Sequence, residues 1–363
     1  MSSTESLNPW LRQAFVQLIA NRAGLKIREN DQEIFQEIVF KRTKRVGLSF
    51  PENYYQFLES QTEESHEEWQ QLIPEITNTE SFFFRDKGQF KLLRNHILPN
   101  LIQCKAQDQT LRIGSAGCST GEEPYSIAIL LKELIPNLEA WNLTILGVDI
   151  NSVAIAKAKA GIYRPWSFRG LDNNIKNQFF QEFNGQYHID SDIKRMVKFQ
   201  TVNLLRDSFS NLNFALENMD LILCRNVFIY FSESAIKTVL NKFYAALQPS
   251  GYLLVGHAEL HGQNLNQFQV KVFEESIAYQ RPTDDAVRPI SSTSMMQATA
   301  PDSQKSATKI DPQNLGNLLA GNDIKMQQVA LNLLRQLPAD TKISRLGNLT
   351  AAELILQLEQ SLK

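Results

Sequence analysis

The fold is decided by Leu111-Arg112-Ile113-Gly114-Ser115-Ala116-Gly117-Cys118-Ser119-Thr120-Gly121-Glu122-Glu123-Pro124-Tyr125-Ser126. The run up to Ser115 has the apolar character of a buried strand, Gly117 and Gly121 favour a turn, and Pro124 suits an early helical position. A strand, a glycine turn and a helix in this order predict the nucleotide pocket of a doubly wound α/β sheet.

The acidic residues in this turn restrict the ligand. The Gly117-x-x-x-Gly121 spacing differs from the G-x-G-x-x-G of dinucleotide enzymes, and Glu122 and Glu123 would repel a pyrophosphate at the helix N-terminus. They suit a nucleoside with positive charge, such as S-adenosylmethionine. Thr120 and Glu123 have the spacing of a capping box, which marks the helix start. Alternatively, the glycines only turn the strand into the helix, and both glutamates are capping acids.

Composition places the chain among ordinary soluble proteins. Of 363 residues, 43% are hydrophobic and 21% charged, and the formal net charge is −2, so we predict no nucleic-acid partner. The first residues lack a leader pattern, and about 18 consecutive apolar residues occur nowhere, so we expect a cytoplasmic protein without membrane insertion. Cys104, Cys118 and Cys224 form no C-x-x-C pair, so neither a disulfide framework nor a metal site is predicted.

Residues 1–76 are predicted to form an all-helical N-terminal domain, because apolar residues recur there at helical spacing. The second helix ends in Lys41-Arg42-Thr43-Lys44-Arg45 before Gly47. These cations either complement the helix C-terminus or form a docking face for an acidic helical partner.

The connector that follows contains Phe82, Phe83 and Phe84 next to Arg85. Three consecutive phenylalanines are not expected to lie in water, so the connector is predicted to cross a cleft and present Arg85 inward. The alternative is that the aromatic rings seal the joint between two domains.

The second buried strand, residues 143–150, carries Asp149 at its end. An acidic residue at this place accepts hydrogen bonds from a ribose diol in nucleotide-binding α/β domains. Its other possible role is to cap the next helix, predicted at residues 152–160.

Residues 161–195 interrupt the alternation of strands and helices. An Asn184-Gly185 turn between short strands predicts a small antiparallel insert. The strand from 196 continues into Asn203-Leu204-Leu205, whose position suits contact with an adenine.

Further strands are predicted at residues 219–224 and 252–256, with a helix capped by Ser232 and a turn at 249–251 between them. Residues 271–280 are predicted to form one edge strand. The Ser-, Thr- and Pro-rich residues 281–320 indicate a flexible linker, and residues 321–363 a helical C-terminal tail. Residues 77–280 are therefore expected to form the ligand-binding domain.

These motifs together resemble the CheR-type chemotaxis receptor methyltransferases, which are protein-glutamate O-methyltransferases. The resemblance covers about residues 15–279 and rests on five segments in order: Thr79 to Arg85, Gly121 to Ser126, Asp149, Asn203 to Leu205, and Cys224 to Phe231. It implies an α/β, Rossmann-like S-adenosylmethionine-dependent methyltransferase sheet with an N-terminal all-helical domain and a small antiparallel β insert.

The resemblance also implies the site. Cofactor contacts carry over to Thr79, Ser81, Arg85, Gly117, Glu123, Asp149, Asn203, Leu204, Cys224 and Arg225, and Tyr230 faces the methyl group. Arg85 and Tyr230 are the candidate catalytic residues. The family usually has Asn-x-Thr where Thr79 and Ser81 stand here, and Asn78 is an alternative contact.

The implied reaction transfers a methyl group from S-adenosylmethionine to glutamate side chains on the cytoplasmic helical domain of methyl-accepting chemoreceptors, leaving S-adenosylhomocysteine. The nucleophile is ionised at neutral pH, so no general base is required. A methyltransferase acting on another carboxylate, or a non-catalytic protein that senses S-adenosylmethionine, are the alternatives. We expect the protein to act as a monomer.

Overall fold

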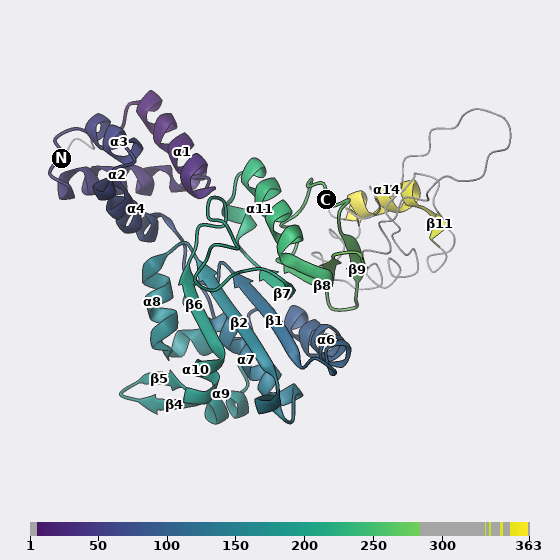
Figure 1. Cartoon of the computed structure of the whole chain (residues 1–363). Coiled ribbons are helices and arrows are strands. Elements are labelled where there is room, and N and C mark those ends of the chain that lie inside the picture. The colour runs from purple at the N-terminus through teal and green to yellow at the C-terminus, as the bar shows by residue number, and fades with distance from the viewer. Residues whose placement is uncertain (1–5, 284–330, 332–333, 335–341, 344–348, 362–363) are drawn as a thin grey trace, which may run out of the picture.

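A helical N-terminal domain lies against one end of an α/β domain built on a central sheet (Figure 1). The computed structural model describes residues 6–283, 331, 334, 342–343 and 349–361. The helical domain comprises α1 (Pro9–Ala23), α2 (Gln32–Arg45), α3 (Pro51–Glu59) and α4 (Glu63–Ile76). The prediction of an all-helical N-terminal segment is confirmed.

Local signals in the sequence set the ends of α1. The side chain of Asn8 accepts a hydrogen bond from the Trp10 amide, Pro9 occupies the first turn, and Gly24 ends the helix in the left-handed conformation at φ 77°. Phe15 packs on Tyr54 of α3, with ring centroids 6.0 Å apart, at the centre of the domain.

The basic residues at the end of α2 differ in burial. Arg42 is buried, and its guanidinium donates to both carboxylate oxygens of Glu68, at 2.8 Å from Nε and 2.5 Å from Nη2. Lys41 is exposed and pairs with Glu75 at 2.6 Å. Arg42 therefore stabilises the domain itself, and docking through the exposed cations at this end of α2 remains a prediction.

Helices α5 (Lys87–Leu92) and α6 (Leu98–Cys104), joined by a π-helical turn (Leu93–Ile97), lead into the sheet. Its strand order is β6-β2-β1-β7-β8-β10-β9. The parallel strands are β1 (Thr110–Ala116), β2 (Asn142–Asp149), β6 (Val197–Thr201), β7 (Met219–Cys224) and β8 (Leu247–Val255).

The central strand β7 is buried on both faces, as expected for a parallel strand between helical layers. Ile222 and Cys224 belong to one hydrophobic cluster, with α11 (Glu233–Ala246) and the helical domain. Leu221 and Leu223 belong to a second cluster, with α6 and α7 (Glu122–Leu134). The alternating side chains of one strand thus hold the two layers together.

A small antiparallel insert follows α8 (Ser152–Ala160), as predicted. Its strands, in the order β3-β5-β4, are β3 (Ile162–Tyr163), β5 (Gln186–Ile189) and β4 (Phe180–Phe183). Asn184 and Gly185 join β4 to β5 with φ values of 52° and 73°, the positive pair that a tight hairpin needs. The short helices α9 (Asn173–Phe179) and α10 (Ser191–Met196) complete this region.

Two predictions in the last third of the sheet are wrong. The predicted turn at residues 249–251 lies inside β8, which already begins at Leu247. Ser250 has a φ of 66°, and the pairing of β8 with β7 shifts register between Met219 and Leu221, so the chain passes through an irregularity of the strand and does not turn. The predicted edge strand is a hairpin of β9 (Gln269–Val272) and β10 (Ile277–Gln280), both antiparallel to their neighbours.

Most of the predicted linker, residues 284–320, lies outside the described residues. Of the predicted tail, the structure describes β11 (Lys342–Ile343), β12 (Leu349–Thr350) and α14 (Ala351–Ser361), in which Leu354 and Leu358 are buried. No helix in the described part of the chain is both long and apolar enough to cross a membrane.

Candidate active site

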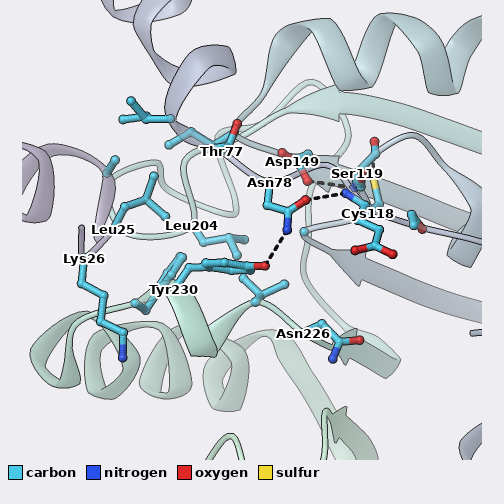
Figure 2. A pocket seen from close by; sticks show the side chains of 18 of the residues that line it. Leu25, Lys26, Thr77, Asn78, Cys118, Ser119, Asp149, Leu204, Asn226 and Tyr230 are labelled. Atoms are coloured by element: carbon cyan, nitrogen blue, oxygen red, sulfur yellow. Dashed lines mark hydrogen bonds between the residues drawn. The ribbon is translucent and has the colours of Figure 1, made fainter. Parts of the chain in front are cut away.

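A cavity of about 390 Å³ lies between the helical domain and the carboxyl ends of β1, β2 and β7. Its walls come from the segment between α1 and α2, the connector after α4, and the loops that follow these strands. Figure 2 shows Asp149 and Ser119 on one wall and Tyr230 on another. The carboxyl ends of parallel strands are where open α/β sheets bind ligands, and the volume suits a small molecule.

The turn after β1 depends on its glycines. Gly117 has φ 73°, and a Cβ there would lie 2.3 Å from a methyl group of Val227. Gly121 has φ 94°, and its Cβ would lie 2.8 Å from the Cβ of Ala158. Both glycines are therefore required by backbone conformation and by close packing, and Gly117 also lines the cavity.

The predicted capping box between Thr120 and Glu123 is wrong. Gly121 occupies the N-cap position of α7, and the Thr120 hydroxyl donates to Glu122 Oε2 at 2.7 Å. Glu123 instead accepts a hydrogen bond from the Ser115 hydroxyl at 2.7 Å. Because Gly121 is the N-cap residue, Glu123 is the second residue of α7, and it lines the cavity.

Glu122 lies away from the cavity lining and is buried. Its Oε1 accepts a hydrogen bond from the Ser167 hydroxyl of the insert at 3.0 Å, and burial raises the pKa of Glu122 above its ordinary value. The two adjacent glutamates therefore have different surroundings, one joining the helix to the insert and the other facing the cavity.

Asp149 accepts backbone hydrogen bonds with both oxygens, Oδ2 from the Ser119 amide at 2.8 Å and Oδ1 from the Asn151 amide at 2.9 Å. Burial raises the pKa of Asp149, and these two donors oppose the rise. Asn151, not Asp149, caps α8 by accepting from the Ala154 amide. Each carboxylate oxygen keeps a lone pair for a further donor, as a ribose diol requires.

Arg225 links the strand ends to the connector. It is buried, and its Nη1 donates to Glu123 Oε2 at 2.9 Å. Its Nε donates to the side chain of Gln89 and its Nη2 to the backbone carbonyl of Arg85. This guanidinium neutralises Glu123 and fixes the connector where Arg85 lines the cavity.

Two of the three connector phenylalanines have different roles. Phe83 is buried in the insert, with ring centroids 4.7 Å from Phe180 and 4.8 Å from Tyr163. Phe82 lines the cavity and stacks under the guanidinium of Arg169, whose Cζ lies 3.9 Å from the ring centroid. The connector thus both lines the cavity and seals a joint, but that joint is with the insert.

Tyr230 lies where the helical domain meets the loop after β7. Its hydroxyl accepts a hydrogen bond from Asn78 Nδ2 at 3.1 Å, the contact drawn in Figure 2. Its carbonyl accepts from the Lys26 amide at 2.8 Å, and the Ser232 amide donates to the Gly24 carbonyl at 3.0 Å. These backbone bonds hold the segment after α1 over the cavity.

Most of the predicted site residues line the cavity: Ser81, Arg85, Gly117, Glu123, Asp149, Leu204, Arg225 and Tyr230. Thr79, Asn203 and Cys224 are not among the lining residues. The Thr79 carbonyl accepts from the Ser119 hydroxyl at 2.7 Å, Asn203 Nδ2 donates to the Arg22 carbonyl at 2.7 Å, and Cys224 is buried at the end of β7. Direct contact of these three residues with a ligand remains a prediction.

Burial raises the pKa values of Cys118 and Cys224 well above the ordinary thiol range. Such thiols are poor nucleophiles. No cluster of His, Cys, Asp and Glu side chains suited to a metal ion occurs among the residues that the structure describes.

Comparison with known proteins identifies the family. Residues 79–277 match the model of the CheR methyltransferase, SAM binding domain. This chain belongs to the CheR methyltransferase family. It is an S-adenosylmethionine-dependent methyltransferase, as the resemblance implied, and the strand order and insert fit the methyltransferase fold.

Three curated relatives of this CheR-family chain illustrate the similarity. It is 32% identical to a chemotaxis protein methyltransferase of Borreliella burgdorferi, over 69% of this chain and 88% of the relative. It is 34% identical to chemotaxis protein methyltransferase 2 of Vibrio cholerae, over 63% and 78% respectively. It is 30% identical to the chemotaxis protein methyltransferase of Escherichia coli, over 67% and 82%.

The structure also adds cavity residues that the sequence-based prediction missed, notably Lys26 and Arg28 in the segment between the first two helices. The sequence does carry a signal for them. In Lys26-Ile27-Arg28 polar and apolar residues alternate, and an extended segment with this pattern presents both cations on one face.

Proposed function

We propose that this CheR-family enzyme methylates glutamate side chains on the cytoplasmic helical domain of methyl-accepting chemotaxis receptors and acts as a monomer. The supporting observation is that Arg85 and Tyr230, suited to an anionic acceptor, line the same cavity as Asp149 and Glu123. The names of the relatives, chemotaxis protein methyltransferases, support a receptor as the acceptor.

The residues present fit S-adenosylmethionine. The Asp149 carboxylate, with a free lone pair on each oxygen, suits the ribose diol, and Glu123 suits the ammonium group. Leu204 supplies an apolar contact for the adenine, and the buried Arg225 holds Glu123 in place. We propose Ser81, Arg85 and Gly117 as further contacts.

Bound S-adenosylmethionine supplies a methyl group on a positively charged sulfur, open to attack by a carboxylate. The residues of the protein need only orient and desolvate the acceptor, because a glutamate with a reference pKa of about 4.3 is ionised at neutral pH. Arg85 is proposed to bind that carboxylate. The Tyr230 hydroxyl, which accepts from Asn78, retains its own hydrogen for donation to the acceptor.

The decisive experiment incubates the enzyme with labelled S-adenosylmethionine and receptor-bearing membranes, and measures base-labile methyl esters. We expect wild-type protein to form them. Labelling of other carboxylate acceptors only would support a different methyltransferase, and binding of S-adenosylhomocysteine without any transfer would support a sensing role; either result would refute the proposal.

Arg85→Ala is expected to reduce methylation by about 100-fold or more, because a charge-assisted contact in a water-poor site is lost. Its thermal midpoint is expected to stay close to that of the wild type, since Arg85 makes no ion pair with a described residue and its hydrogen bond from Nη1 to the Glu80 carbonyl is exposed. Arg94→Ala, which removes a pair with Glu133 away from the cavity lining, is the matched control. Wild-type turnover by Arg85→Ala would contradict the assignment.

A further inference from the structure

We propose that Arg28, between α1 and α2, binds the carboxylate of the acceptor glutamate and holds it against Tyr230, which gives the enzyme its preference for glutamate over glutamine. This inference rests on the proposed glutamyl methylation. Arg28 lines the cavity and is exposed, so an incoming side chain can reach it.

The geometry that carries the inference is the stacking of Arg28 on Tyr230. The guanidinium carbon lies 4.8 Å from the centroid of the tyrosine ring. A cation above an aromatic face is held by the ring, while the N–H groups at the edge of the guanidinium stay available for two parallel hydrogen bonds to a carboxylate. Arg28 is therefore both positioned and able to bind.

The rest of the Tyr230 environment supports this placement. The bond from Asn78 Nδ2 to the tyrosine hydroxyl leaves the O–H hydrogen free to donate elsewhere. The backbone bond between Lys26 and Tyr230, at 2.8 Å, fixes the distance between the Arg28 segment and the tyrosine loop. A carboxylate at this point receives donors from both Arg28 and Tyr230.

Two cations that line the cavity, Lys26 and Arg28, are not used in ion pairs with described residues and can bind an anion. Among described residues, Glu80 pairs with Arg169, Glu75 with Lys41 and Arg42, and Glu123 with Arg225. No ion pair between described residues involves Lys26 or Arg28. The acids Asp31 and Asp149 also line the cavity and partly offset this positive charge. Asp149 is the residue proposed to bind the ribose.

Arg28 is better suited than Arg85 to make the first contact. Arg85 is half-buried, and its Nη1 already donates to the Glu80 carbonyl at 2.9 Å. The guanidinium of Arg28 makes no hydrogen bond to any residue in the described part of the chain, so all its donors are available. Arg28 is expected to select the carboxylate and hold it against Tyr230, and Arg85 to bind the same carboxylate from the connector.

The test uses full-length protein in two assays. The first measures methyl-ester formation on receptor membranes by wild type, Arg28→Met and Arg28→Lys. The second measures binding, with S-adenosylhomocysteine present, of a helical peptide with one glutamate and of the same peptide with glutamine. Arg206→Met, an exposed arginine that does not line the cavity, is the control.

We expect Arg28→Met to raise the KM for receptor about 10- to 100-fold, the size of one charge-assisted contact, and to lose the preference for the glutamate peptide. Arg28→Lys should recover part of both, because it restores charge without the bidentate geometry. Affinity for S-adenosylhomocysteine should stay within about twofold of the wild type, since Arg28 is assigned to the acceptor.

Three results would overturn the inference about Arg28: an unchanged KM, an unchanged preference between the peptides, or a parallel loss of S-adenosylhomocysteine binding in Arg28→Met. Failure of the proposed function gives a different pattern. Wild type would then form no ester on receptor membranes, while an Arg28-dependent preference for the glutamate peptide would still support Arg28 as the carboxylate-binding residue. A wild type that prefers neither peptide and forms no ester refutes both.

Discussion

Replacement of Gly117 by alanine tests how the cofactor turn is built. An added Cβ would lie 2.3 Å from Val227 Cγ2 and 3.3 Å from Val227 Cγ1, at a φ of 73°. A left-handed L-residue costs about 1–2 kcal/mol, and overpacking typically adds about 1–3 kcal/mol. The free energy of unfolding should therefore fall by about 2–5 kcal/mol, and affinity for S-adenosylhomocysteine should fall with it because the turn lines the cavity.

Two control variants separate the cost of the left-handed backbone from the cost of overpacking against Val227. Gly47 has a φ of 76° and no atom within 4 Å of its added Cβ, so Gly47→Ala should show the backbone cost alone, about 1–2 kcal/mol. Val227→Ala removes the two methyl groups that clash, so the double variant with Gly117→Ala should lose less stability than the sum of the single changes, by about 1–3 kcal/mol.

Urea denaturation followed by circular dichroism measures the wild type and all four variants, and calorimetric titration measures S-adenosylhomocysteine affinity. If Gly117→Ala and Gly47→Ala lost equal free energy of unfolding, overpacking against Val227 would contribute nothing, and that part of the prediction would be refuted. Strict additivity in the double variant would refute the contact with Val227 as the cause.

Two further predictions concern buried and half-buried charge. Glu68→Gln removes the charge that pairs with the buried Arg42 and leaves Glu75, at 3.3 Å, as its ion-pair partner, so we expect urea denaturation to show a loss of about 3–5 kcal/mol, and a loss below about 1 kcal/mol would contradict this. For Asp86, burial opposes ionisation, but the 2.8 Å pair with His257, the charge of Arg225 and the Gln89 amide together lower the pKa. Its ionisation therefore stabilises the fold above the unfolded pKa of about 3.9, and that contribution is lost as the pH falls through the lower folded value. Asp86→Asn should cost about 1 kcal/mol near pH 7 and nothing in acid, as measured by urea titrations from pH 7 to pH 3; a difference independent of pH would refute this assignment.

The sequence was sufficient wherever neighbours along the chain decide the outcome. The strand and turn of residues 111–121, the position of Asp149 at a strand end and the hairpin at Asn184-Gly185 follow from runs of apolar residues and from backbone conformations that glycine and asparagine accept. The family resemblance added further lining residues, such as Leu204, Arg225 and Tyr230, because its motifs lie at these strand ends.

The sequence was insufficient where a side chain had more than one possible partner. Thr120 and Glu123 have the spacing of a capping box, but the structure pairs Glu123 with Ser115 and Arg225. Ser250 satisfies a turn pattern, yet it lies within a continuous strand whose register shift absorbs it. In both cases a partner distant in sequence decides, and local propensity carries no information about that partner.

Local sequence thus determined the cofactor turn and the strand ends, since short-range sterics and apolar periodicity act within a few residues. Only tertiary structure decided what surrounds the reacting groups. The hydrogen bond from Asn78 to Tyr230 joins residues 152 positions apart, and the stacking of Arg28 on Tyr230 likewise requires the helical domain to lie over the sheet. The burial of the two hydrophobic clusters brings these segments together, because apolar surface from both domains leaves water only when they pack.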